Sequence, residues 1–252
     1  MEIVFSNPCF IGDVLCTIPP IHVWKKLTNA KITLFYEQMT VDSEPLSILK
    51  EDPAIDEIHC LPFGSIPRTS RDGKIVKVVT KEWFEEHLGR KVDQCFDLHQ
   101  HWTGSNGKNW FKYSELDWDK QKIPLQFFPT KDQEEMGLEF KGMVGISDRV
   151  PGYETIAKTL QDNGLKTIYI SKNLGMNLME VHCIIKNLDF LVTACCLHNT
   201  LCWATATPNY VMWTAQSKEI WFDYQNPNTT IIHSNTQEEL YAQLRAHKRI
   251  TS

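Results

Sequence analysis

The chain has 252 residues, of which 42% are hydrophobic and 23% charged, a composition typical of globular proteins with a substantial core. Its formal net charge of -5 indicates no broad basic surface for nucleic acid, although a local basic groove stays open. The first residues form no signal peptide, and no window reaches the roughly 18 uninterrupted apolar residues of a membrane span, so we expect a cytoplasmic protein.

The first predicted elements form a βαβ unit. Residues 2–6 predict a buried strand, 13–27 a helix and 31–37 a second strand. Pro19 and Pro20 require a kink in this helix or a late start. Because parallel strands need such a crossover, we expect the two strands to pair in parallel.

The rest of the first half continues the alternation more weakly. Residues 57–61 and 94–98 predict strands, and 81–91 predict a helix. Residues 67–73 are polar and predict a loop. Residues 103–139 are polar, aromatic and irregular, which indicates a rim and a linker.

A second alternation begins at Lys141. Strands are predicted over 142–147, 165–171, 189–196, 209–215 and 229–234. Helices are predicted over 152–163, 178–188, 198–207 and 236–250, the last with Thr236 as its cap. We therefore predict an α/β protein with two domains, residues 1–135 and 136–252; a single doubly wound sheet is the alternative.

The eight cysteines are scattered through apolar segments and include no C-x-x-C pair. We expect reduced, mostly buried thiols. Cys195, Cys196, His198 and Cys202 match no common zinc spacing, so no metal site is predicted.

The stretch FIGDVLCTIPPIHVWKKLTNAKITLFYE, after the first predicted strand, contains the pattern (I/L)GD(V/I)-x-x-(T/L) followed closely by a proline. With this motif the first half resembles glycosyltransferase family nine, the ADP-heptose:lipopolysaccharide heptosyltransferases, which open with a motif of similar spacing. The matching residues are Ile11, Gly12, Asp13, Val14, Leu15, Thr17 and Pro19. The segments DPAIDEIHCLPF and CFDLHQH resemble two further family segments in the same order.

The second half is also similar to this family, with one departure. The run from LMEVHCIIKNL to NYVMWTA resembles the family's late helix, strand and donor loop. That loop usually reads D-(S/T)-G-x-x-H, whereas residues 195–200 here read CCLHNT. Because a glycine lets a backbone approach a phosphate closely, Leu197 changes the expected donor contacts.

The resemblance implies a GT-B-like fold, in which two Rossmann-like parallel-sheet domains face a central cleft. It further implies an inverting, metal-independent glycosyltransferase with a nucleotide-diphosphate sugar as co-substrate and no other cofactor. For the acceptor, the family implies the hydroxyl of a saccharide or lipid-linked saccharide, and a hydroxymethylated DNA base is the alternative. A non-catalytic nucleotide-sugar-binding module remains an alternative. An epimerase or dehydrogenase lacks support, since no G-x-G-x-x-G follows the first strand.

Asp13 is the predicted catalytic base. It follows the first strand, where open α/β sheets place their ligand crevice, and a carboxylate there can take the proton of an acceptor hydroxyl. The resemblance assigns it the same role. The alternative is a cap on the following helix. Gly12, His99 and His101 are predicted to line the acceptor side.

Five residues are predicted to bind the donor. Ser147 and Arg149 follow a strand of the second half, and a guanidinium can pair a phosphate bidentately. The amides of Asn199 and Thr200 are predicted to open a helix and to hold phosphate. His198 is predicted to replace the displaced family histidine; a structural role is the alternative.

Overall fold

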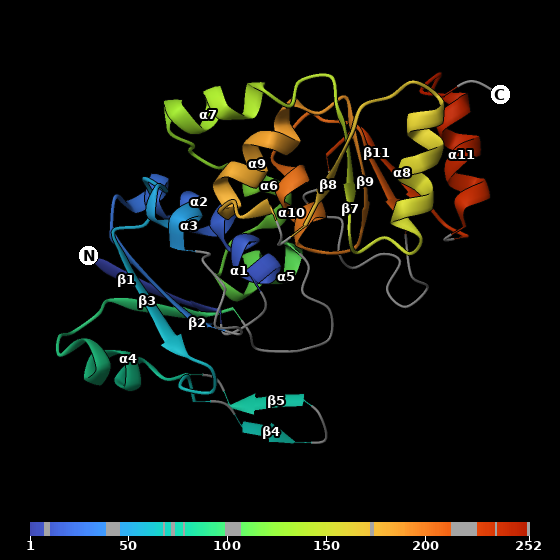
Figure 1. Cartoon of the computed structure of the whole chain (residues 1–252). Coiled ribbons are helices and arrows are strands. Elements are labelled where there is room, and N and C mark those ends of the chain that lie inside the picture. The colour runs from blue at the N-terminus through green and yellow to red at the C-terminus, as the bar shows by residue number, and fades with distance from the viewer. Residues whose placement is uncertain are drawn as a thin grey trace. The chain divides into compact units, whose positions relative to one another are not determined.

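Figure 1 shows a computed structural model that describes residues 1–7, 11–38, 46–67, 69–71, 74–77, 79–98, 107–171, 174–212, 226–234 and 236–250. The chain divides into two compact units. The described residues of the first lie within Met1–Phe128, and those of the second within Pro129–Lys218 and Gln225–Ser252. Each unit has its own parallel sheet, so the alternative of one doubly wound sheet is wrong.

The first unit contains a four-stranded sheet. Its strands are β1 (Glu2–Asn7), β2 (Lys31–Gln38), β3 (Glu57–Pro62) and β6 (Gln94–Asp97). Their order is β3-β2-β1-β6, and every neighbouring pair is parallel. The predicted βαβ unit is therefore confirmed, with β1 in register against both β2 and β6.

The described helices of the first unit connect these strands. They are α1 (Ile11–Leu15), α2 (Ile18–Thr28), α3 (Leu46–Lys50), α4 (Lys81–Leu88), α5 (Gly107–Tyr113) and α6 (Trp118–Gln121). The late helix start is confirmed, because Pro19 and Pro20 lie in the first turn of α2, where the missing N–H groups have no helical partner.

The two faces of this sheet pack against different helices. On one face Phe84 of α4 packs with Val4 and Phe35. On the other face Trp24 of α2 lies 5.2 Å from Phe96, measured between ring centroids. Burial of both faces explains the nearly continuous apolar runs of these strands.

Two sequence expectations in the first half are wrong. Within the expected loop 67–73 the chain forms β4 (Thr69–Arg71), which pairs antiparallel with β5 (Lys74–Lys77). The segment expected to be irregular contains α5, α6 and α7 (Lys131–Leu138). Short polar strands and helices carry little hydrophobic periodicity, so their sequence signal is weak.

The second unit contains a five-stranded sheet. Its strands are β7 (Val144–Ser147), β8 (Thr167–Ile170), β9 (Phe190–Ala194), β10 (Asn209–Met212) and β11 (Thr229–Ile232). Their order is β11-β10-β9-β7-β8, again with parallel pairs throughout. All five agree with the predicted second alternation.

Helices cover both faces of this second sheet. They are α8 (Tyr153–Asp162), α9 (Leu178–Asn187), α10 (Leu197–Trp203) and α11 (Gln237–Ala246). Figure 1 shows α8 and α11 on one face and α9 and α10 on the other. Ile156, Leu160 and Leu240 join the core on the first face. The predicted cap is confirmed, since Thr236 Oγ1 accepts from the Glu239 amide at 3.3 Å.

Helix α7 belongs to the second unit because it packs on α9. Their backbones approach closely at Gly137, where an added Cβ would lie 2.6 Å from the Cys183 carbonyl oxygen. The predicted domain boundary at residues 135/136 thus falls inside α7, and the second compact unit begins at Pro129. Among the described helices, none is long and apolar enough to cross a membrane.

Candidate functional site

In the second sheet, the direction in which successive strands are added reverses between β7 and β9. From β7 the chain passes outward to β8, and it then returns to the other side of β7 with β9. In open α/β sheets ligands bind outside the carboxyl ends of the strands at such a switch point. Ser147 ends β7, and residues 195–198 follow β9, so the topology brings these two segments to one place.

Three of the predicted donor residues meet there. Ser147 is fully buried, and its Oγ lies 2.8 Å from Nδ1 of His198. The backbone amide of Arg149 donates to the same Oγ at 3.2 Å. A hydroxyl and an imidazole thus meet at the switch point, beside the backbone of the turn that carries Arg149; hydroxyl and imidazole groups can both bind phosphate.

Cys196 is a fourth member that the sequence reasoning missed as a site residue. Its Sγ lies 3.6 Å from Thr193 Oγ1 and 3.9 Å from Ser147 Oγ. Burial raises the pKa of this thiol, but hydrogen bonds and charge from His198, with Thr193, outweigh it and lower the pKa to about 7. The available signal was a cysteine between a buried strand and a helix, two residues before a histidine.

The Arg149 side chain is placed differently from its amide. It is 59% exposed, and its Nε lies 3.8 Å from Oδ1 of Asp148. This pair is loose and exposed, so little free energy holds the guanidinium in place. Arg149 can therefore turn toward an anion without losing a strong partner.

Asn199 and Thr200 are engaged within α10. Their amides donate to the Cys196 carbonyl at 3.0 and 3.3 Å, so they are not directed at a ligand. The Asn199 carboxamide is buried and accepts from Asn209 Nδ2 at 2.7 Å. The helix starts at Leu197, one residue before the predicted range 198–207, and its opening amides are those of Leu197 and His198, not those of Asn199 and Thr200.

The first sheet has its own switch point between β1 and β6. After β3 the chain crosses to the far side of β1 and pairs with it as β6. Ser6 Oγ donates to Asp97 Oδ1 at 3.1 Å, and the Val79 amide donates to Asp97 Oδ2 at 3.1 Å. These bonds join the carboxyl ends of the two strands, from which both predicted acceptor segments start.

The predicted acceptor-side residues follow these two strands. Gly12 and Asp13 lie in α1, the first described element after β1. Thr17 stands at the cap position of α2, and its side chain makes no capping hydrogen bond. The Asp13 side chain, His99 and His101 lie outside the described residues, so their roles stay predictions.

The described residues contain no group of three His, Cys, Asp or Glu side chains that could hold a metal ion. None of the described cysteines forms a disulfide bond. Most of the donors at the β7–β9 switch point are neutral or cationic. Such a set suits an anionic ligand better than a cation.

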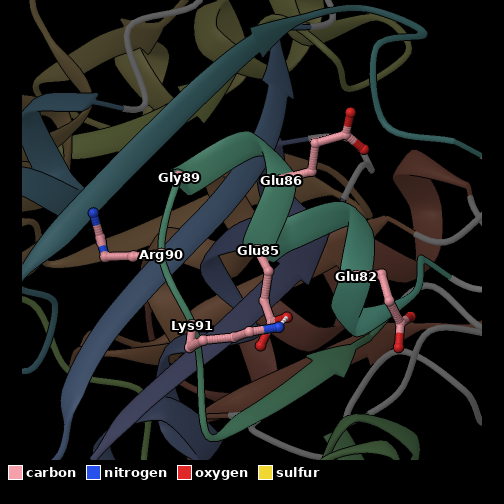
Figure 2. Close-up of a pocket in the computed structure, with 6 residues that line it drawn as sticks. All are labelled: Glu82, Glu85, Glu86, Gly89, Arg90 and Lys91. Atoms are coloured by element: carbon pink, nitrogen blue, oxygen red, sulfur yellow. Dashed lines mark hydrogen bonds and ion pairs between the residues drawn. The ribbon is translucent and has the colours of Figure 1, made fainter.

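Figure 2 shows a surface depression on the first unit, lined by Glu82, Glu85, Glu86, Gly89, Arg90 and Lys91. Lys91 Nζ lies 2.7 Å from Glu85 Oε2 across it. Arg90 pairs with Glu2 and Glu57, which lie at the amino ends of β1 and β3. The depression therefore lies toward the edge of the sheet opposite the ligand-binding edge, and it is mostly acidic.

No protein-family model matches the sequence, and no curated protein is significantly similar to it. Solved structures do share its fold. A glycosyl transferase family 9 structure from Veillonella parvula has a TM-score of 0.65 and 13% identity, and the match covers 100% of this chain and 90% of that one.

Two Escherichia coli enzymes are similar to the same extent. The heptosyltransferase WaaC with ADP has a TM-score of 0.65 and 13% identity, with 98% of this chain and 99% of that one covered. The ADP-heptose LPS heptosyltransferase II has a TM-score of 0.61 and 11% identity, with 98% and 100% covered. The predicted resemblance is therefore confirmed in the fold: over nearly its whole length, this chain has the two-sheet, GT-B-like α/β architecture of family 9 glycosyltransferases.

Proposed function

We propose that this protein is a glycosyltransferase that moves a sugar from a nucleotide-diphosphate donor to an acceptor hydroxyl, with inversion and without a metal ion. The observation that carries the proposal is the fold shared with glycosyltransferases along nearly the entire chain. One of those structures contains ADP and another ADP-2-deoxy-2-fluoro heptose.

The second unit is assigned to the donor. Its switch point collects Ser147, Arg149 and His198, which together offer a hydroxyl, a guanidinium and an imidazole. As the glycosidic bond breaks, negative charge builds on the departing diphosphate. Donors that are already in place stabilise that charge without reorganising, which lowers the barrier.

The first unit is assigned to the acceptor and the base. Asp13 follows β1 on α1, beside the switch point of its own sheet. In an inverting displacement the acceptor oxygen attacks the anomeric carbon while the diphosphate leaves from the opposite face. Only one base is needed, and a carboxylate that takes the hydroxyl proton contributes typically 10²–10⁴-fold.

Substitution of Asp13 by Asn tests the base. We expect Asp13→Asn to lower kcat by about 10²–10⁴-fold and to leave donor affinity nearly unchanged, since the amide keeps the size but loses the basicity. Asp162→Asn, on the exposed end of α8, is the matched control and keeps full turnover. Equal kcat values in the two variants would exclude Asp13 as the base.

The donor class is tested by thermal unfolding with ADP-, UDP-, GDP- and CMP-sugars. A ligand that binds only the folded state raises the melting temperature, so one nucleotide class should stand out. Turnover is then measured with saccharide, lipid-linked saccharide and hydroxymethylated DNA acceptors. Stabilisation with neither transfer nor donor hydrolysis would support the non-catalytic module instead.

A further inference from the structure

A cluster of nucleophilic and titratable side chains lies where β7 and β9 end. Cys196 Sγ contacts the hydroxyls of Thr193 and Ser147 at 3.6 and 3.9 Å. His198 bonds the same Ser147 hydroxyl at 2.8 Å. The four side chains come from β7, β9 and the start of α10, so the thiol belongs to a group assembled by the fold.

Cys196 differs from the other described thiols in the same unit. Cys183 and Cys202 are fully buried, and burial raises the pKa of each to about 11. Cys196 keeps a minor part of its surface exposed, and its pKa is lowered to about 7. Thiols that are partly exposed and lie next to a histidine are the reactive ones in proteins.

The charged groups around the cluster are few. His198 on α10 interacts directly with the thiol. Asp148 and Arg149, in the turn after β7, pair with each other at 3.8 Å. Strand β9 contributes the neutral hydroxyl of Thr193. His198 is therefore the group expected to govern the reactivity of Cys196.

We propose that Cys196 is a modification site for low-molecular-weight disulfides, and that its modification blocks the donor site. The Cys196 thiolate attacks one sulfur of the small disulfide, a new S–S bond forms and the old one breaks. The other half leaves as a thiolate, which takes up a proton from water. The first part of the proposal stands on the cluster alone, whereas the block of the donor site rests on the proposed function.

The block follows from the position of the sulfur. Sγ lies 3.9 Å from Ser147 Oγ, the atom that is also bonded by His198 and by the Arg149 amide. A group attached to Sγ takes up space beside these donors. It would therefore compete with a diphosphate for these donors.

The test uses the native full-length protein and dithiodipyridine, a neutral disulfide that releases a coloured thione on exchange. Labelled peptides are identified by mass spectrometry between about pH 6 and pH 9. About half of Cys196 is ionised at pH 7, against roughly 3% of an ordinary thiol with a pKa near 8.5. After allowance for its lower intrinsic nucleophilicity, we expect labelling about three- to four-fold faster than that of an ordinary exposed thiol.

The pH dependence is the sharper readout. The labelling rate of Cys196 should level off above about pH 7, whereas that of N-acetylcysteine, an ordinary thiol measured beside it, should keep rising to about pH 8.5. The fast phase of labelling, which we assign to Cys196, should persist in the Cys195→Ser variant and disappear in the Cys196→Ser variant. A fast phase that follows Cys195, or a Cys196 rate that still rises above pH 8, would overturn the proposal.

His198→Gln tests the cause. We expect the Cys196 inflection to move toward higher pH and its rate at pH 7 to fall at least three-fold. Cys183 and Cys202 report on folding, because they stay unlabelled unless the protein opens. An unchanged inflection in a folded His198→Gln variant would show that His198 does not govern the reactivity of Cys196. If this variant unfolds, the proposal is judged on the pH profile of the wild-type protein.

Protection by nucleotides separates this inference from the proposed function. ADP or UDP at saturation should slow Cys196 labelling at least five-fold and leave Cys195 less affected, and labelled protein should lose nucleotide binding. Fast, pH-dependent labelling without protection by nucleotide would support a reactive Cys196 but show that it does not lie in a donor site. Protection by nucleotide without any glycosyl transfer would support both the reactive thiol and its place in a nucleotide site, and would contradict the proposed reaction.

Discussion

At the scale of single residues, Ser147 has the most connections in the candidate donor site. Its buried Oγ bonds His198 Nδ1 and accepts from the Arg149 amide. It fixes the imidazole and the turn in one arrangement before a ligand arrives. Such preorganisation reduces the free energy that must be spent on ordering when the ligand binds.

Replacing Ser147 by Ala should therefore weaken nucleotide binding. We expect a loss of about 1–2 kcal/mol, which is roughly 5- to 30-fold in the dissociation constant, because the hydroxyl and the position of His198 are lost together. Calorimetric titration with the nucleotide found by thermal unfolding measures this. Thr155→Ala, on the exposed face of α8, is the control and should bind normally. An equal affinity in both variants would remove Ser147 from the site.

At the scale of secondary-structure elements, each unit is stabilised by an internal contact between neighbouring elements. The first is the crossing of α7 and α9, where Gly137 brings the helices close to backbone distance. The second is a charged network at the amino ends of the first sheet, where Lys31 and Arg90 pair with Glu2 and Glu57. Both lie away from the ligand-binding edges, so they act on stability.

Gly137→Ala should destabilise the second unit. The added methyl group would meet the Cys183 carbonyl, which is backbone and cannot turn aside, so α7 must shift. We expect a cost of about 1–3 kcal/mol in the free energy of unfolding. Urea denaturation measures it, with Glu135→Ala on the exposed side of α7 as the control, expected within about 0.5 kcal/mol. A neutral Gly137→Ala would show that the two helices are not held this close.

The charged network should make stability depend on acid pH. The hydrogen bond from Lys31, with those from His59 and Arg90, lowers the pKa of Glu57 to about 2 despite partial burial. Because the folded pKa lies below the unfolded value, ionised Glu57 stabilises the fold at neutral pH, and this contribution is lost as the pH falls from about 4.5 toward 2.

Glu57→Gln should consequently cost about 1 kcal/mol at pH 7, a value kept small because these side chains are partly exposed. The difference from the unmodified protein should shrink by pH 3. Parallel urea titrations at the two pH values measure it. If the difference grew on acidification, the sign of the Glu57 shift would be wrong.

At the scale of the whole molecule, the two units have the same kind of sheet edge, at which we predict that ligands bind. Each has a parallel sheet with one switch point, between β1 and β6 in the first and between β7 and β9 in the second. The first is followed by the predicted base and the second by the predicted donor residues. Two substrates assigned to two units match a reaction that joins a donor to an acceptor.

We predict that glycosyl transfer by this protein requires no metal ion. Cationic and neutral donors of the second unit are expected to stabilise the leaving diphosphate, so EDTA should leave the transfer rate within about two-fold. The rate is measured before and after dialysis against the chelator. A large loss that Mg²⁺ or Mn²⁺ restores would place a metal ion in the reaction.

The sequence by itself determined the local elements and where most of them begin. Strand and helix periods, the Pro19–Pro20 start of α2 and the Thr236 cap of α11 all depend on neighbours within a few residues, so they could be predicted. The same local reasoning placed Ser147 and His198 at strand ends, but it did not find the β4–β5 hairpin or the helices between residues 107 and 138.

Only the tertiary structure decided which strand ends meet. Ser147 and His198 are 51 residues apart, and they touch because β9 pairs with β7 on the side that β8 leaves open. That pairing also brings Cys196 to Ser147. Strand order depends on how all the helices bury both faces of the sheet at once, and no short stretch of sequence contains that information.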